Sequence, residues 1–287
     1  MQKTHLQHLI ELLIATLLIS TSGALGRFIA MPPPVIIWWR CGIALVVLYA
    51  YCRYKKVDLR IKSTKDKRSF LLAALLLGTH WVGYFYALKL SNVALAMLSL
   101  FAFPVITALL EPLFFKQKLK PIHLLLGFLI LLGIYILAPE FNLENSHVKG
   151  ILLGLFSAVC YSIRILILKR HVSTYNGTML MFYQLLVLTI ILAPVLYFMD
   201  TSGIQTQFPF VLLLALLTTA IGHTLFIKSL KYFAASTASI INSVQPIFGI
   251  MFAFFFLSEI PTMNTFFGGL LILSTVIIES VRSKKSR

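Results

Sequence analysis

The segment LKLSNVALAMLSLFAFPVITALL (residues 88–110) returns in outline 142 residues later as LKYFAASTASIINSVQPIFGIMF (residues 230–252). The same spacing, with no gap, places LGFLILLGIYI (126–136) on GGLLILSTVII (268–278). An offset that holds across two apolar segments and the loop between them indicates an internal duplication. The residues that coincide include Pro104 with Pro246, Lys89 with Lys231, Ala96 with Ala238 and Gly127 with Gly269.

The composition of the 287-residue chain predicts an all-α polytopic membrane protein. Hydrophobic residues make up 59% and charged residues 12%, and the mean hydropathy is +0.91. Soluble domains carry roughly twice this share of charged residues. A net charge of +16 would suit a nucleic-acid-binding protein, but its distribution along the chain has a different explanation, given below.

About 20 apolar residues cross a bilayer as a helix, and the sequence offers ten such runs bounded by charges, Gly and Pro. The first run follows Lys3 and ends in small residues, as a cleaved signal peptide does, but the repeat needs it as a helix, so we expect it to be retained. The predicted transmembrane helices cover residues 9–29, 35–53, 70–89, 93–115, 121–138, 150–168, 177–198, 209–230, 235–257 and 263–281.

The positive charges are divided unequally between the two sides of these predicted helices. Of the 25 Lys and Arg residues, 20 fall on the side of both termini, three on the other side and two within the helices. Cytoplasmic loops carry such an excess, so we expect both termini in the cytoplasm and the chain in the bacterial inner (plasma) membrane. The basic loop 53–68 can also contact anionic lipid headgroups, and no nucleic-acid partner is implied.

Five helices in each half is an odd number, so the second half must sit upside down relative to the first. The prediction is therefore ten transmembrane helices in two inverted five-helix repeats, residues 1–145 and 146–287. Inverted repeats are a recurrent plan of secondary transporters, with the substrate site near the membrane midplane where the halves meet.

This chain resembles the EamA-type ten-helix transporters of the drug/metabolite transporter superfamily. The resemblance rests on the 5 + 5 arrangement, on Pro104 and Pro246 in the fourth and ninth helices, on Arg40 in WWRCGIALVVL and on Glu259 in FLSEIPT. The first half departs from the pattern at Gln117, where such sequences often carry Glu. The resemblance implies export of small metabolites, often amino acids, through a central cavity.

Arg40 lies in an apolar helix, about 9 Å below its outer end at the α-helical rise. Three interpretations compete. The side chain extends to the outer lipid headgroups, or it pairs with Glu259 or with backbone carbonyls, or it faces the cavity and attracts an anionic group of the substrate. The counterpart in the second half is Gln184, which is neutral and lies on the opposite side of the membrane.

The third helix contains GTHWVGYFYAL, in which His80 and Tyr84 share one face and Trp81 lies alongside. His223, in AIGHTLF, lies one position from the repeat equivalent of His80. These histidines are either hydrogen-bonded packing residues or cavity residues that bind substrate or carry protons. The neighbouring aromatic rings would suit an amino acid or heteroaromatic substrate through stacking or cation–π contact.

The prolines of the fourth and ninth helices predict helix breaks that serve in gating. Each removes a backbone hydrogen bond, and in a membrane such breaks face protein or a water-filled cavity. Asn242 and Gln245 lie beside the second break, and Leu100 and Phe103 beside the first. This difference predicts one polar and one apolar cavity wall; hydrogen bonding of the two amides between helices is the alternative.

The sixth helix carries a polar stripe in which Ser157 and Arg164 lie one turn either side of Tyr161. We expect Tyr161 to contribute to the substrate site. Arg164, nearer the inner surface, is expected to pair with a carboxylate rather than to bind substrate. The candidates are Glu11, Glu111 and Glu279.

These observations predict a secondary transporter that exports small metabolites such as amino acids by alternating access. The sequence lacks GxxxxGK[ST], HExxH, Ser–His–Asp spacing and a metal cluster, so no cofactor, metal or catalytic residue is expected. One alternative is a membrane-embedded enzyme that acts on a lipid-linked substrate through His80 or His223 with Glu111. The other is a lipid-flipping or structural component of a membrane complex. The oligomeric state stays open between monomer and homodimer.

Overall fold

The computed structural model describes residues 5–116, 119, 121–137 and 142–285, and these residues form helices and no strand. Six helical spans among them are long and apolar enough to cross a membrane, and four more apolar helices are shorter. The predicted class, an all-α polytopic membrane protein, is confirmed. Each of the ten predicted segments contains a helix, and ten crossings of the membrane stay a prediction.

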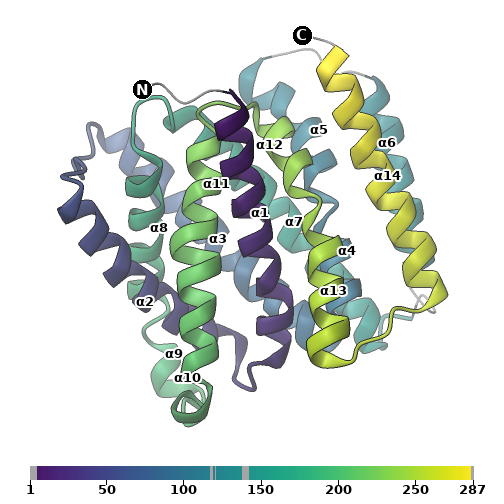
Figure 1. The fold of residues 1–287 in the computed structure, drawn as a ribbon, viewed down its shortest axis with the longest axis horizontal. Coiled ribbons are helices and arrows are strands. Elements are labelled where there is room, and N and C mark those ends of the chain that lie inside the picture. The colour runs from purple at the N-terminus through teal and green to yellow at the C-terminus, as the bar shows by residue number, and fades with distance from the viewer. Residues whose placement is uncertain (1–4, 117–118, 120, 138–141, 286–287) are drawn as a thin grey trace.

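The helices form a bundle of roughly parallel and antiparallel rods (Figure 1). The first half holds α1 (His5–Phe28), α2 (Pro33–Tyr54), α3 (Thr64–Leu90), α4 (Val93–Leu100), α5 (Phe103–Phe115) and α6 (Pro121–Leu137). The second half holds α7 (Ser146–His171), α8 (Gly177–Ile191), α9 (Val195–Phe198), α10 (Ile204–Leu213), the π-helix η1 (Leu214–His223), α11 (Thr224–Ser229), α12 (Ala235–Asn242), α13 (Gln245–Leu257) and α14 (Met263–Lys285).

Two helices begin earlier than their apolar runs predict, because polar residues cap them. The Ser63 side chain accepts a hydrogen bond from Lys65 N at 3.1 Å, so α3 begins at Thr64 rather than at residue 70. Asn145 accepts from His147 N at 2.8 Å and starts α7 four residues before the predicted position. Both extra turns are polar, as suits a position outside the hydrocarbon layer.

The fourth and ninth segments are each divided into two helices. Residues 101–102 separate α4 from α5, and residues 243–244 separate α12 from α13. Pro104 and Pro246 lie in the first turn of the following helix, where the missing N–H leaves no hydrogen bond unmade. The structure therefore places a break beside each proline.

The helix packing is reciprocal between the two halves. Helix α3 packs along α7. The elements 142 residues away pack in the same way, because η1 and α11, the equivalents of α3, lie along α1, the equivalent of α7. Equivalent helices also meet directly, α2 with α8 at one edge of the bundle and α6 with α14 at the other (Figure 1). Two repeats related by a two-fold axis would produce this pattern; the inverted repeat itself stays a prediction.

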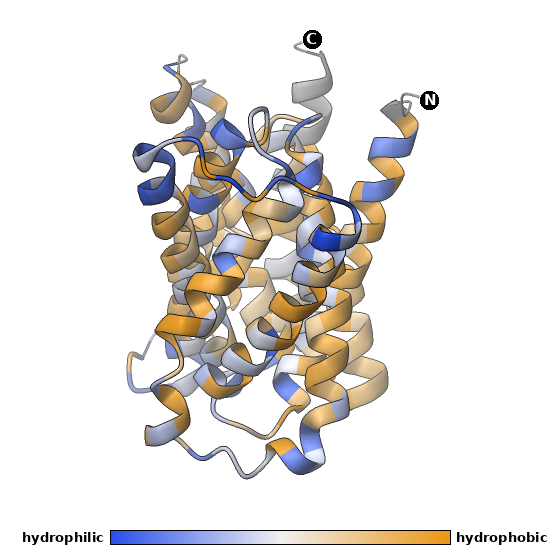
Figure 2. Cartoon of the chain, turned by 90° about the vertical axis from the view of Figure 1, so that its left-hand side faces the viewer, coloured by the Kyte–Doolittle hydropathy of each residue, from blue (hydrophilic) through white to orange (hydrophobic). Residues whose placement is uncertain are grey.

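Polarity divides the bundle into a hydrophobic middle and two hydrophilic ends (Figure 2). Large apolar side chains are exposed along the outside of the helices, among them Leu13, Phe128 and Phe255. The beginning of α1 and the end of α14 lie at the same end of the molecule (Figure 1), which requires an even number of crossings. Gln117 lies outside the described residues.

Candidate functional site

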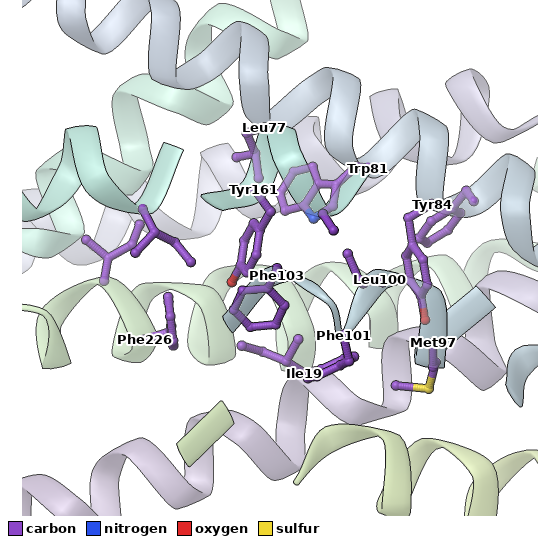
Figure 3. Packing of buried hydrophobic residues seen from close by; sticks show 14 of the residues in the cluster. Ile19, Leu77, Trp81, Tyr84, Met97, Leu100, Phe101, Phe103, Tyr161 and Phe226 are labelled. Carbon is purple, nitrogen blue, oxygen red and sulfur yellow. The ribbon is translucent and has the colours of Figure 1, made fainter. Parts of the chain in front are cut away.

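A small cavity lies at the centre of the bundle, where the two helix breaks meet α1, α3, α7 and η1. The volume of this cavity is about 20 Å³, which is room for about one water molecule. The bundle is thus closed around it. Figure 3 shows aromatic side chains gathered there, with Trp81, Phe103 and Tyr161 from three different helices. The lining residues are Ile19, Ser22, His80, Trp81, Tyr84, Met97, Leu100, Phe101, Phe103, Tyr161, His223, Asn242 and Gln245.

The structure brings together seven of the eight residues that the sequence suggested for substrate binding, and only Arg40 is missing from the lining. Eight of the lining residues form pairs related by the 142-residue spacing. In each pair the residue from the first half is apolar, and the residue from the second half carries a hydroxyl, an imidazole or an amide. The pairs are Trp81 with His223, Leu100 with Asn242, Phe103 with Gln245, and Ile19 with Tyr161.

All four lining residues from the second half are polar, whereas the first half supplies the apolar lining residues together with Ser22, His80 and Tyr84. Trp81 and His223 even touch, with ring centroids 5.2 Å apart in an edge-on arrangement. Residues that are equivalent in two repeats meet only near the axis that relates the repeats. The cavity therefore lies where the two halves of the chain meet.

His80 is held in place by Ser157. The Ser157 hydroxyl donates to the His80 carbonyl oxygen at 2.9 Å, and His80 Nδ1 lies 2.7 Å from the same hydroxyl oxygen. Since the hydroxyl hydrogen is used on the carbonyl, this geometry assigns the imidazole proton to Nδ1, which donates to Ser157. The ring stacks on Tyr161 with centroids 4.4 Å apart. His80 is thus a packed residue that also lines the cavity, and Nε2 makes no hydrogen bond among the described residues.

His223 is the last residue of the π-helix η1. Its Nδ1 is buried without a hydrogen-bond partner among the described residues. π-Helical turns are rare and are frequent at functional sites. The apolar periodicity of this segment predicted an ordinary helix, and no signal in the sequence pointed to the wider turn.

The amides of Asn242 and Gln245 line the cavity and also form hydrogen bonds between helices, the two roles that the sequence offered as alternatives. The Asn242 side-chain oxygen accepts from Thr16 Oγ1 on α1 at 3.2 Å and also from the Gln245 amide. Both side chains line the cavity at the same time. The second break is thereby tied to α1 while its amides still face the central space.

Arg40 has a completely buried side chain, which excludes the interpretation that it reaches the lipid headgroups. Its Nε donates to Thr219 Oγ1 at 2.9 Å and its Nη2 to Thr218 Oγ1 at 2.8 Å. The guanidinium lies over the Trp81 ring, with Cζ 4.1 Å from the centroid. The alternative in which Arg40 pairs with Glu259 does not hold, because two threonine hydroxyls accept from Arg40 and Glu259 accepts from other residues.

Glu259 instead joins the end of α1 to the start of α4, at the end of the bundle opposite the chain termini. It accepts from Arg27 Nε at 3.3 Å and from Val93 N, the first residue of α4, at 2.9 Å. Arg27 Nη1 also donates to the carbonyls of Leu88 and Lys89 at 2.9 and 3.0 Å. This outer clasp was not predicted, although Arg27 and Lys89 were both expected near the outer surface.

Arg164 is also completely buried, and its partners among the described residues are uncharged, in place of the expected carboxylate. Its Nε donates to Gln184 Oε1 at 2.6 Å, and Nη2 lies 3.9 Å from Met181 Sδ. The Glu279 side chain lies outside the described residues. Glu111, the carboxylate that the enzyme alternative requires, is not among the described residues that line the cavity with the two histidines.

Comparison with known proteins agrees with the geometry. The EamA-like transporter family matches residues 8–138 and, a second time, residues 148–280. The pseudopaline exporter CntI of Pseudomonas aeruginosa is 24% identical over 258 residues, which are 89% of this chain and 88% of that protein. An uncharacterized transporter of Archaeoglobus fulgidus is 34% identical over 139 residues, 46% of this chain and 44% of that protein.

A crystal structure with 17% sequence identity superposes with a TM-score of 0.74, over 99% of this chain and 100% of that one, and so has the same fold. The two matches of the family together cover most of the chain. The chain belongs to the EamA-like transporter family, within the drug/metabolite transporter superfamily.

Proposed function

We propose that this protein is a secondary transporter that exports small metabolites, amino acids among them, by alternating access. The observation that carries the proposal is the central cavity, which both halves of the chain line with residues at equivalent positions. In inverted-repeat transporters the substrate site lies between the repeats, and their relative movement opens it to one side and then to the other.

Contacts at the two ends of the bundle close the cavity to both sides, and loss of the contacts at one end would open the cavity to that side. At the outer end the clasp of Arg27 and Glu259 joins α1 to α4. At the opposite end Lys169, in the last turn of α7, donates to the carbonyls of Leu230 and Phe233 after α11, both at 2.7 Å. The breaks beside Pro104 and Pro246 lie between these two ends, where bending of a helix would connect the cavity to either side.

A named relative and the charge distribution support the proposed direction and location of transport. One relative is named as an exporter, which favours export here. The excess of Lys and Arg on the side of the termini favours the bacterial inner membrane with both termini in the cytoplasm.

Flux measurements in proteoliposomes test the proposal. We expect saturable flux of at least one radiolabelled amino acid above the flux in protein-free liposomes. Ser22→Phe, which fills the cavity, should abolish this flux, whereas Thr206→Phe, an equal enlargement at an exposed position, should leave it unchanged. Both variants must elute as the wild type does in size-exclusion chromatography.

Two results would contradict the proposal in different ways. Absence of saturable flux for every amino acid would contradict the substrate class. Undiminished flux through Ser22→Phe would contradict the cavity as the transport path. Repeating the assay with and without a pH gradient then decides whether protons drive the flux.

A further inference from the structure

Two buried arginines flank the central cavity, and neither belongs to its lining. The Arg40 guanidinium lies 4.1 Å from the Trp81 ring, and that of Arg164 lies 5.6 Å from the Tyr161 ring. Both rings line the cavity, and both contact His223, at centroid distances of 5.2 and 6.4 Å. A continuous aromatic cluster therefore separates one cation from the other, with the cavity between them.

Among the residues that the structure describes, the partners of both arginines are uncharged. Arg40 donates to two hydroxyls, and Arg164 contacts an amide oxygen and a thioether sulfur. None of the described Asp or Glu side chains is buried. Burying a guanidinium without a carboxylate costs several kcal/mol, and such groups inside a membrane protein mark substrate or ion pathways.

Side-chain nitrogens in the cavity lining and behind its aromatic rings are also left without hydrogen-bond partners. Nη1 of Arg40 and Nη1 of Arg164 are buried without a partner among the described residues, and so is Nδ1 of His223. Buried polar atoms without partners are uncommon in folded proteins and call for a specific explanation. Two of these nitrogens are guanidinium donors on the buried cations behind the Trp81 and Tyr161 rings, and such donors fit a ligand rich in acceptor oxygens.

We propose that the transported substrate is a small organic anion, with one or more carboxylates and a net negative charge. This inference rests on the proposed transport function and specifies its substrate class. Carboxylate oxygens match the geometry of guanidinium donors, and the attraction is weakly screened in the interior of the bundle. The apolar wall of Trp81, Leu100 and Phe103 would receive the carbon skeleton of the same molecule.

The depths of the two arginines suit movement of an anion in both directions. The topology predicted from the charges places Arg40 nearer the outer surface and Arg164 nearer the inner surface. An anion that leaves the cavity toward either side then passes one fixed positive charge. A neutral or cationic substrate would gain nothing from this arrangement.

A charge series on one carbon skeleton tests the inference with the wild-type protein. For phenylalanine the series is N-acetylphenylalanine (anion), phenylalanine (zwitterion), N-acetylphenylalaninamide (neutral) and phenylalaninamide (cation). The corresponding leucine and aspartate series cover other skeletons. We expect the anion to be transported at least tenfold faster, at equal concentration, than the neutral amide of the same skeleton.

Variants then test whether Arg40 and Arg164 cause the preference for the anion over the neutral compound. Arg40→Gln and Arg164→Gln should each reduce the ratio of anion to neutral flux by about tenfold. Arg60→Gln, the same change at an exposed position in the basic loop, should leave the ratio unchanged. Because a buried variant can fail to fold, the wild-type series decides by itself when a variant is not recovered as a monodisperse protein.

The outcomes separate the inference from the proposed function. Equal or faster flux of neutral or cationic members overturns the anion inference and leaves the transporter intact. A retained anion preference in both arginine variants also overturns it. Absence of saturable flux in every member of every series overturns the proposed amino-acid-like substrate class, and the inference falls with it.

Discussion

At the scale of single residues, Arg40 donates its hydrogen bonds to the hydroxyls of Thr218 and Thr219, where a buried arginine usually has a carboxylate partner. The two hydroxyls lie on consecutive residues of the π-helix η1 and accept from Nε and Nη2. Their own hydrogens go to the Leu214 carbonyl, at 2.6 and 3.3 Å. The wider π-helical turn thus carries two acceptors to one guanidinium.

Removing these hydroxyls should destabilise the protein without changing its shape. For the double substitution Thr218→Val and Thr219→Val we expect a loss of about 3 kcal/mol, since each hydrogen bond to a charged group contributes about 1.5–3 kcal/mol. In a chain of this size such a loss corresponds to a decrease in melting temperature of about 6–12 °C, measurable by tryptophan fluorescence in detergent.

A matched control separates this effect from the loss of any buried hydroxyl. Thr275 is also completely buried but donates only to Ile272 O in its own helix, at 2.6 Å, so Thr275→Val should change the melting temperature little. A decrease as large in the control as in the double variant would show that Arg40 does not rely on the two hydroxyls.

The polar wall of the cavity makes a second prediction at this scale. Asn242→Leu with Gln245→Phe converts the second break into a copy of the first, with Leu100 and Phe103 as the template. We expect a folded protein whose flux, for the fastest compound of the charge series, is at least tenfold below wild type. Leu100→Met, a volume-conserving change in the opposite wall, should retain most of the flux. Undiminished flux in the double variant would remove these amides from the site.

At the scale of elements, the helices of the bundle approach closely where glycine faces a neighbour. Gly154 on α7 faces α4, and a Cβ placed there would lie 2.0 Å from Ser99 Oγ and 3.3 Å from Ala96 O. Ser99 is fully buried and donates to the Leu95 carbonyl at 2.8 Å, so it has little room to turn aside. The absence of a side chain at residue 154 therefore sets the distance between α4 and α7, and with it one side of the cavity.

An added methyl group should have opposite effects at two glycines. Gly154→Ala should destabilise the protein by about 1–3 kcal/mol through overpacking. Gly42→Ala, in α2, meets nothing within 4 Å and should stabilise by up to about 1 kcal/mol through helix propensity. Thermal unfolding of both variants in the same detergent measures the difference, and equal melting temperatures would contradict the close packing of α4 and α7.

At the scale of the whole molecule, both ends of the bundle are hydrophilic while its middle is apolar (Figure 2), and the Lys and Arg residues are unequally divided along the chain. The basic loop between α2 and α3 lies at the end where the chain starts and finishes, and the connection between α9 and α10 lies at the opposite end (Figure 1). The charge distribution therefore predicts which end faces the cytoplasm.

Cysteine labelling in intact cells tests this orientation. The native residues Cys41, Cys52 and Cys160 are buried and should not react with a membrane-impermeant maleimide. We expect Ser202→Cys, near α10, to be labelled from outside, and Arg60→Cys, in the basic loop, to be labelled only after the membrane is opened. The reverse pattern would invert the predicted topology.

The class of the protein and most of its cavity were predictable because both depend on local or periodic signals. Apolar runs of about 20 residues mark helices irrespective of their neighbours. The repeat spacing brought Trp81 together with His223, and the helix breaks drew attention to Asn242 and Gln245. The positions of these residues along their helices then sufficed to place them near the middle of the bundle.

The hydrogen-bond partners of the charged residues could not be predicted from the sequence. The sequence predicts how far along its helix each of Arg40, Arg164 and Glu259 lies, but it does not predict the rotation of that helix about its axis or which helix faces the residue. Oppositely charged residues were therefore paired by depth alone. In the structure Arg40 turns toward the threonines of η1, and Glu259 turns toward Arg27.

The membrane class, the order of the helices, the two breaks and most of the residues that line the cavity can be predicted from the amino-acid sequence, because hydrophobic length and repeat spacing act along the chain. That the described partners of the two cations beside the cavity, Arg40 and Arg164, are uncharged groups becomes visible in the folded molecule alone. Hydrogen bonds to a buried charge form between whichever side chains the packing of helices brings within 3 Å, and no local pattern encodes that choice.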